Sequence, residues 1–162
     1  MKTLRITYIG MLIVLLLYPL GVFGENKLEP VTPTRNDKCP VCGMFVYRYP
    51  EWTTQIIFKG GSYAVFDGVK DMIKFYLNIS RYSSKNLTDI EAMYVKDYYS
   101  LNYIDARKAF YVIGSDILGP MGKELIPFEK ESDAKVFMKD HKGQKILKFQ
   151  EITTETIKLL EE

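Results

Sequence analysis

Hydrophobic and polar positions alternate after residue 52 and then change period, which predicts a β-hairpin followed by a helix. Residues 53–58 are rich in β-forming side chains, 59–62 (Lys-Gly-Gly-Ser) are typical of a hairpin turn, and 63–66 form the returning strand. Asp67 is expected to cap a helix, because the apolar side chains that follow it recur with the helical period. These side chains are Val69, Met72, Ile73 and Tyr76.

The same order of elements is predicted for the second part of the chain. Ile90–Lys96 is the expected third strand of the first part. Strands at 109–114 and 125–128 then precede a helix at 132–139 and a closing strand at 145–149. The predicted fold class is therefore α+β, with two similar ββαβ halves packed as a pseudo-repeat.

A degenerate internal repeat supports this division. A phenylalanine is followed after five residues by an aspartate and after four more by a second phenylalanine, and the pattern occurs once in each half. The first copy is Phe66, Asp71 and Phe75, and the second is Phe128, Asp133 and Phe137.

The N-terminal segment has the composition of an export signal. Lys2 and Arg5 precede a mostly apolar run from Ile6 to Phe23, and the small residue Gly24 follows it. We therefore expect a signal peptide at 1–24. The run of about 18 residues is also near the lower limit for spanning a bilayer, so an uncleaved signal anchor is the alternative.

Composition limits the remaining organisation and the function. Without residues 1–24 the Lys and Arg count falls from 22 to 20, which equals the Asp and Glu count, so no basic surface for nucleic acid is expected. Residues 25–37 are polar and carry two prolines, as an extended linker would. We place the first half at 38–100, the second at 101–152 and a C-terminal tail helix at 153–162.

The strongest chemical signal is Cys39-Pro-Val-Cys42-Gly-Met44, which holds both cysteines of the chain. Two thiols at this spacing converge on one metal ion or form a disulfide, and the Met44 thioether adds a third soft donor that favours Cu(I). A disulfide here would close a very short loop and stabilise little. A thioredoxin-like pair would open a helix, whereas the residues after Cys42 look β-like. A structural zinc site would need four ligands, usually from more cysteines or histidines.

Two further residues are candidate ligands. Met121 lies in a Gly-Pro-Met-Gly turn at 119–122, where a role in core packing is less expected than for the other methionines. His141 is the single histidine and is expected at the end of the second helix, where a solvated, dipole-stabilised position is the preferred interpretation. The chain shows no Ser/His/Asp set or phosphate-binding glycine loop, so an enzyme is not expected.

These motifs together resemble the NosL family. The resemblance rests on Cys39–Val46 (Cys-Pro-Val-Cys-Gly-Met-Phe-Val), the Gly-Gly turn with Phe66-Asp-Gly, Gly119–Gly122, and Phe149–Ile152, so it covers nearly all of the chain from 39 to 152. It implies two ββαβ halves, a fold likened to the organomercurial lyase MerB. It also implies Cu(I) bound by Cys39, Cys42, Met44 and Met121 outside the cytoplasm. Many members are lipoproteins, but this sequence has no lipid-attachment cysteine at its signal.

The family resemblance favours one of several functions. It implies a periplasmic or extracytoplasmic Cu(I) metallochaperone that supplies copper for maturation of nitrous oxide reductase, together with a membrane transporter complex. The same domain would also suit copper trafficking to another cuproenzyme. A thiol–disulfide oxidoreductase using Cys39 and Cys42, and a metal-free interaction domain with an ordinary disulfide, are the alternatives from other classes.

Overall fold

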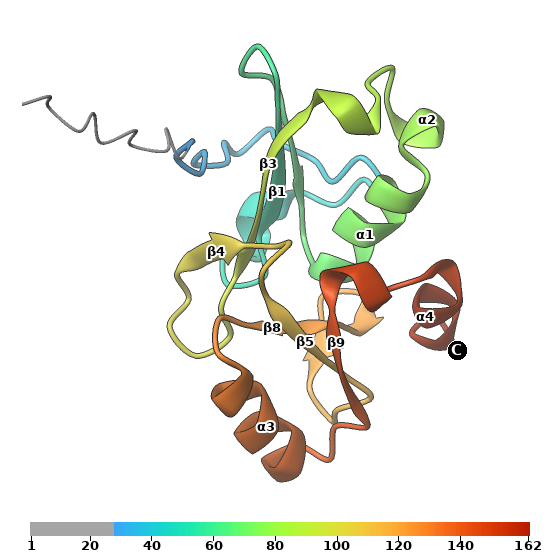
Figure 1. Ribbon diagram of the computed structural model, residues 1–162. Coiled ribbons are helices and arrows are strands. Elements are labelled where there is room, and N and C mark those ends of the chain that lie inside the picture. The colour runs from blue at the N-terminus through green and yellow to red at the C-terminus, as the bar shows by residue number, and fades with distance from the viewer. Residues whose placement is uncertain (1–27) are drawn as a thin grey trace, which may run out of the picture.

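The first half of the chain is a four-stranded antiparallel sheet with a helix on one face. The computed structural model describes residues 28–162, and its strands β1 (Thr54–Phe58), β2 (Tyr63–Phe66), β3 (Ile90–Lys96) and β4 (Tyr103–Asp105) lie in the order β2-β1-β3-β4 (Figure 1). Helix α1 (Val69–Leu77) packs against β1 and β2. All five residues of β1 are buried, as expected for a central strand.

The second half repeats this arrangement with a smaller sheet. Strands β5 (Phe110–Ile113), β8 (Ile126–Phe128) and β9 (Lys145–Lys148) lie in the antiparallel order β8-β5-β9, and α3 (Glu131–Asp140) covers one face. The first, second and third strands of the two ββαβ units thus occupy equivalent places, β2-β1-β3 and β8-β5-β9. This confirms the predicted α+β class and the ββαβ pseudo-repeat.

The phenylalanines of the repeat make equivalent contacts in both halves. The rings of Phe66 and Phe75 lie with their centroids 5.2 Å apart, and those of Phe128 and Phe137 lie 5.0 Å apart. Each pair joins the end of the second strand to the helix, and all four side chains are buried. The shared spacing in the sequence therefore reflects a shared packing contact between strand and helix.

Several short elements are added to these two units. Helix α2 (Ile79–Tyr82) follows α1, and α4 (Thr154–Leu159) packs against α1. Short 3-10 helices occur at Val46–Arg48, Leu87–Asp89 and Phe149–Glu151. The strands β6 (Leu118–Gly119) and β7 (Gly122–Lys123) form a small hairpin between β5 and β8 that has no counterpart in the first half.

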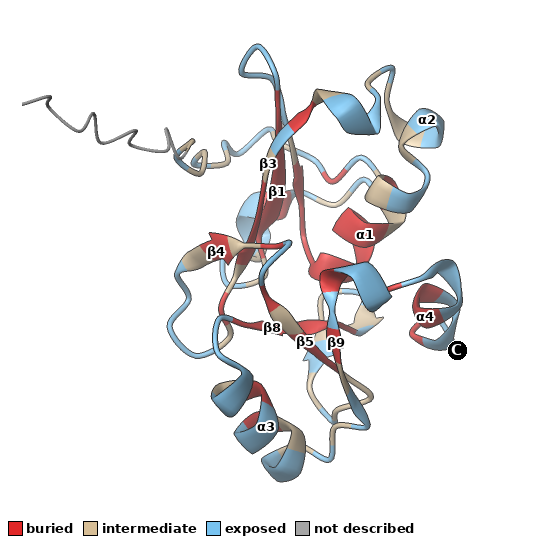
Figure 2. Ribbon diagram, viewed as in Figure 1, coloured by how far each residue is buried: buried red, intermediate tan, exposed pale blue. Residues whose placement is uncertain are grey.

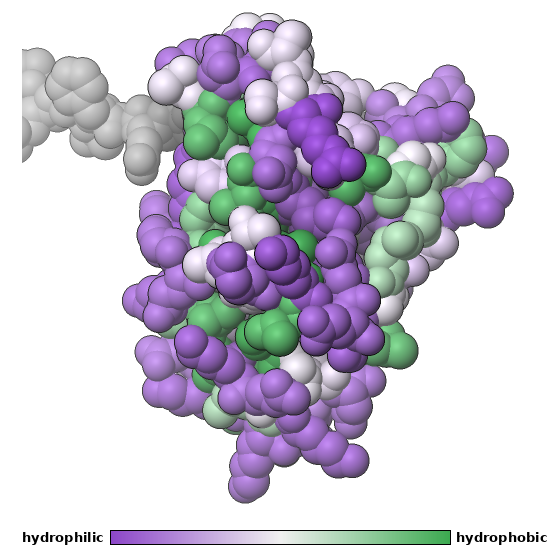
Figure 3. Space-filling view, turned by 90° about the vertical axis from the view of Figure 1, so that its right-hand side faces the viewer, coloured by the Kyte–Doolittle hydropathy of each residue, from purple (hydrophilic) through white to green (hydrophobic). Residues whose placement is uncertain are grey.

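The main hydrophobic core lies between the two halves. Tyr111 of β5 faces this core together with α1 residues such as Met72, whereas its neighbour Val112 faces the core under α3. Successive side chains of a strand point to opposite faces, so β5 is buried on both sides. Figure 2 shows the buried residues concentrated along the sheets and on the inner side of α1. On the face seen in Figure 3, hydrophobic side chains are interspersed among hydrophilic ones.

The described part of the predicted linker contacts the first sheet. The backbone N–H of Val31 donates to Gln55 Oε1 (2.7 Å), and Gln55 Nε2 donates back to the Val31 carbonyl (3.1 Å). The signal peptide or anchor predicted at 1–24 lies outside the described residues. From residue 28 onward, the structure contains no helix with the length and hydrophobicity needed to cross a membrane.

Candidate metal centre

The segment Cys39–Met44 folds into a tight turn that places both thiols on one side. The Cys39 N–H donates to the Met44 carbonyl, and the Gly43 N–H donates to the Cys39 carbonyl, each at 2.9 Å. Gly43 has a φ of +79°, in the left-handed region that glycine adopts at little cost. The motif therefore does not open an α-helix, and the β-like continuation expected after it is limited to a bridge between Lys38 and Phe45.

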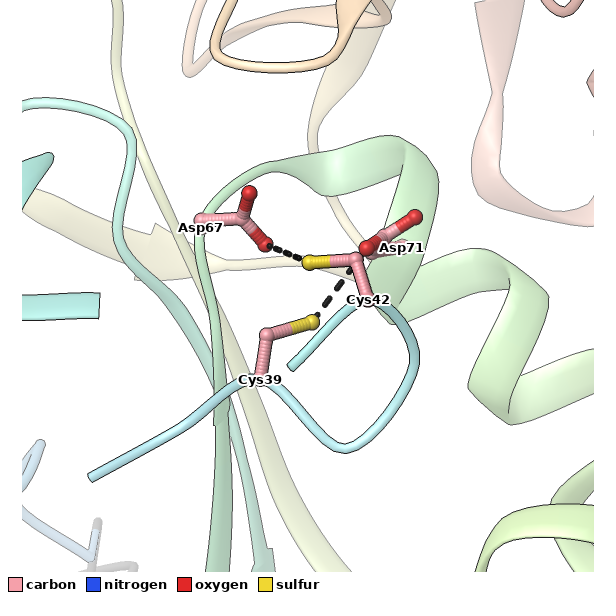
Figure 4. A group of neighbouring side chains, drawn as sticks. All are labelled: Cys39, Cys42, Asp67 and Asp71. Carbon is pink, nitrogen blue, oxygen red and sulfur yellow. Dashed lines mark hydrogen bonds between the residues drawn. The ribbon is translucent and has the colours of Figure 1, made fainter. Parts of the chain in front are cut away.

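Two carboxylates face the thiols from the start of α1. Cys39 Sγ donates to Asp71 Oδ2, and Cys42 Sγ donates to Asp67 Oδ1, both at 3.2 Å (Figure 4). One ligand atom from each of the four residues can be chosen so that all lie within 4.8 Å of one another. The cysteine turn and the start of α1 are about 30 residues apart in the sequence. Together they form a compact cluster of two sulfurs and two carboxylates.

Burial keeps both thiols protonated. Removal from water raises the pKa of Cys39 well above its usual range, and the Asp71 and Asp67 charges raise it further. Burial also raises the pKa of Cys42 to about 12, with the Asp71 and Asp67 carboxylates adding to the effect. Cys39 is only 1% exposed, whereas Cys42 is half-buried. The metal-free cluster is therefore a dithiol held by two hydrogen bonds, with Cys42 as its more accessible member.

Asp67 does not cap the helix, which corrects the expectation from the sequence. The N-cap position of α1 is Gly68, which has no side chain to accept a hydrogen bond. Instead Glu124, from beyond the β6–β7 hairpin, accepts the N–H of Lys70 through Oε1 at 2.6 Å. Because the distant Glu124 carboxyl group satisfies the helix end, the Asp67 carboxylate is available to face Cys42.

The donor set suits a metal ion. Asp67 is buried, and its Oδ2 atom has no hydrogen-bond partner among the described residues. A buried carboxylate oxygen without a partner is costly, and a cation beside it would remove that cost. Each thiol proton points at a carboxylate. A metal ion bound by both sulfurs would therefore replace both protons. The site can therefore bind a metal through Cys39 and Cys42, with Asp67 and Asp71 next to it.

The other candidate ligands from the sequence occupy three different places. Met44 is half-buried and ends the cysteine turn. Met121 is 45% exposed at the tip of the β6–β7 hairpin, and its carbonyl accepts from Lys70 Nζ at 2.8 Å, so its backbone lies against the start of α1. His141 ends α3, where its Nδ1 lies 3.0 Å from Asp116 Oδ1 and its ring stacks on Phe137.

Sequence reasoning missed the two carboxylates as site residues. Asp67 lies just before the N-cap of α1 and Asp71 lies in its first turn, and the closeness of two carboxylates at one helix start was the available signal. The repeat pattern obscured this signal, because it matched Asp71 with Asp133 of α3. Asp133 lies beside Ser132 and, within the described residues, has no cysteine near it. The shared aspartate thus belongs to a cluster in one half only.

Comparison with known proteins agrees with this fold. The family model described as NosL matches residues 30–157. The copper-binding lipoprotein NosL of Stutzerimonas stutzeri is 33% identical over 155 residues, covering 88% of this chain and 78% of the relative. The crystal structure of the copper chaperone NosL from Shewanella denitrificans is similar in fold, with a TM-score of 0.67 and 24% identity over 78% of this chain and 97% of that one. The chain therefore belongs to the NosL family.

Proposed function

We propose that this protein is a Cu(I) metallochaperone that binds the ion at the Cys39–Cys42 turn and passes it to a client. The observation that carries the proposal is the convergence of two thiols and two carboxylates within 4.8 Å. The description of the 33% identical relative as a copper-binding lipoprotein supports copper as the metal. Thiolates and thioethers are soft donors that suit Cu(I), which supports the reduced state of the copper.

The proposed ligands are Cys39, Cys42, Met44 and Met121. Met44 follows the second cysteine within the same turn, and the hairpin that carries Met121 is bonded to Lys70, one residue before Asp71. Thioethers are soft, uncharged donors that hold Cu(I) without the proton release that thiols require. The ligands of the bound ion can be exchanged one at a time for ligands of a client protein, and a chaperone needs this exchange to release the ion.

The same site is poorly suited to thiol–disulfide exchange. A catalytic dithiol reacts through a thiolate, which a low pKa supplies. Here burial and two carboxylates raise the pKa of both thiols, and the turn that carries them is not followed by an α-helix. The chemistry of the pair therefore supports metal binding over a redox enzyme, and we propose a non-catalytic role.

The proposed location is outside the cytoplasm. The predicted signal at 1–24 and linker at 25–37 would export the domain or tether it to a membrane, and the relative's description as a lipoprotein supports a tethered form. The proposed client is nitrous oxide reductase, served in concert with a membrane transporter complex, and another cuproenzyme is the alternative. The halves proposed at 38–100 and 101–152 and the tail at 153–162 form the exported domain.

A competitive titration tests the binding. Reduced protein from residue 25 onward is titrated with Cu(I) against a chromophoric chelator, together with Cys42→Ser and Met121→Leu. We expect one tightly bound ion, loss of that binding in Cys42→Ser and weaker binding in Met121→Leu. Leu118→Ala is the matched control, because it removes an exposed apolar side chain from the same hairpin. Failure of the unaltered protein to compete for Cu(I) would refute the proposal.

A further inference from the structure

A buried lysine joins the start of α1 to the β6–β7 hairpin. Lys70 is 5% exposed, and its Nζ donates to the carbonyls of Met121 (2.8 Å), Lys123 (2.8 Å) and Leu160 (3.4 Å). An ammonium group has three protons, so all three are used on backbone oxygens. Two of these oxygens belong to the hairpin and the third to the end of α4, which makes Lys70 the meeting point of three segments.

A buried glutamate makes the reciprocal connection. Glu124 directly follows the hairpin, is 3% exposed, and accepts the N–H of Lys70 (2.6 Å) and of Leu125 (2.9 Å) through Oε1. Glycines pack closely against it, since a Cβ on Gly68 would lie 2.3 Å from Glu124 Oε2 and one on Gly119 would lie 3.1 Å from its Cγ. The helix start and the hairpin are thus fitted together from both sides.

These polar contacts matter because the hairpin has little else to hold it. Each of its strands is two residues long, and such a hairpin is not stable alone. Its large apolar side chains, Leu118 and Met121, are 62% and 45% exposed, so they bury little surface. The position of the hairpin relative to α1 therefore depends strongly on Lys70 and Glu124.

The contact that Lys70 and Glu124 make between the start of α1 and the hairpin, called the joint below, lies directly beside the thiol cluster. Gly68 and Lys70 lie between Asp67 and Asp71 in the chain, the two residues that face Cys42 and Cys39. We propose that Lys70 and Glu124 are positioning residues, which hold the Met121 hairpin against the start of α1 so that the Met121 thioether stays in reach of the bound ion. This inference rests on the proposed function, in which Met121 is a ligand.

The first test needs no copper. In Lys70→Met the apolar stem remains and the three donors are lost, so we expect the amides of 118–123 to exchange with deuterium at least 10-fold faster in the metal-free protein. Lys74→Met is the matched control, because it removes a charge one turn further along α1, where the ammonium pairs with Glu161. Unchanged hairpin exchange in Lys70→Met would overturn the joint itself, whatever the protein binds.

The second test reads the ligand directly. With ¹³C-methyl methionine, Cu(I) should shift the Met44 and Met121 methyl signals in the unaltered protein, and only the Met44 signal in Lys70→Leu, which removes the three donors without adding a thioether beside the site. Cu(I) affinity should fall about 10- to 100-fold, as for lost supporting contacts at metal sites. Adding Met121→Leu should cause no further loss, because both changes remove the same ligand. Independent, multiplying losses or a retained Met121 shift would overturn the positioning role.

Milder variants keep the inference testable if Lys70→Met or Lys70→Leu fails to fold. In Gly119→Ala the new Cβ would lie 3.1 Å from Glu124 Cγ. Its effects on amide exchange and on the Met121 signal should lie between those of the unaltered protein and of the Lys70 variants. Glu124→Gln keeps an oxygen acceptor for both N–H groups and should leave the Met121 signal as in the unaltered protein. An unaltered Met121 signal in Gly119→Ala would count against the inference. Absence of Cu(I) binding in every protein would refute the proposed function while the exchange result still judges the joint.

Discussion

The pH dependence of Cu(I) affinity follows from the state of the two thiols. Cu(I) binds thiolates, so binding at Cys39 and Cys42 must release two protons while both thiols are protonated. The pKa of Cys42 is raised to about 12 and that of Cys39 is raised further, so both remain protonated through pH 10. The apparent binding constant should then rise about 100-fold per pH unit, or about 10⁶-fold from pH 7 to pH 10.

Ordinary thiols would behave differently. With a pKa near 8.5 they ionise within this range, and the same interval would give only about 10³-fold. The assay is a competition titration at several pH values with a chelator whose own Cu(I) affinity is constant over the range. Burial is the main cause of the raised Cys42 pKa, so Asp67→Asn should lower this pKa only in part and flatten the dependence only toward pH 10. Glu124→Gln is the control, since the pKa of Glu124 is raised to about 8 by burial and this group also titrates in the interval. A gain near 10³-fold in the unaltered protein would refute the reasoning.

Three further predictions concern reactivity and stability. At pH 7.5 the raised pKa of Cys42 should make its alkylation by iodoacetamide, followed by mass spectrometry, about 10³-fold slower than that of free cysteine; a rate within tenfold of free cysteine would contradict this. Gly68→Ala should lower the free energy of unfolding in urea by about 1–3 kcal/mol, because its Cβ would lie 2.3 Å from Glu124 Oε2, and an unchanged midpoint would be inconsistent with that contact. The pKa of Glu124 is raised from 4.5 to about 8, so the folded protein keeps a proton that the unfolded chain loses, and the free energy of unfolding falls with rising pH in this range. Relative to the unaltered protein, the free energy of unfolding of Glu124→Gln should gain about 1.4 kcal/mol per pH unit between pH 5 and 7.5. Parallel plots of this free energy against pH for the two proteins would argue against it.

The fold was largely predictable because its information is local. Helix α1 follows from the periodic apolar residues after Asp67, and β1 and β2 follow from alternation around a Gly-Gly turn. The Phe-Asp-Phe spacing indicated the repeat, since each phenylalanine pair joins neighbouring elements of one half. Such features depend on residues fewer than ten apart, where sequence patterns are most informative.

The candidate site was only partly predictable because its contacts are distant in sequence. The cysteine turn is local, and its spacing identified it. The pairing of Asp67 with Cys42 spans 25 residues, and that of Glu124 with the Lys70 N–H spans 54. The helix-capping rule uses only neighbouring residues and predicted Asp67 as the N-cap. In the structure Glu124 from the other half bonds to the helix end instead, and Asp67 faces the thiol. No pattern within either half contains that information.

X-ray absorption at the copper edge of the Cu(I)-loaded protein is the most direct test of copper binding at Cys39 and Cys42, because it reports the atoms bound to the ion. We expect a first shell dominated by sulfur, with fewer sulfur neighbours in Met121→Leu and a disrupted shell in Cys42→Ser. A first shell of nitrogen and oxygen alone, or a sulfur shell that Cys42→Ser leaves unchanged, would contradict it.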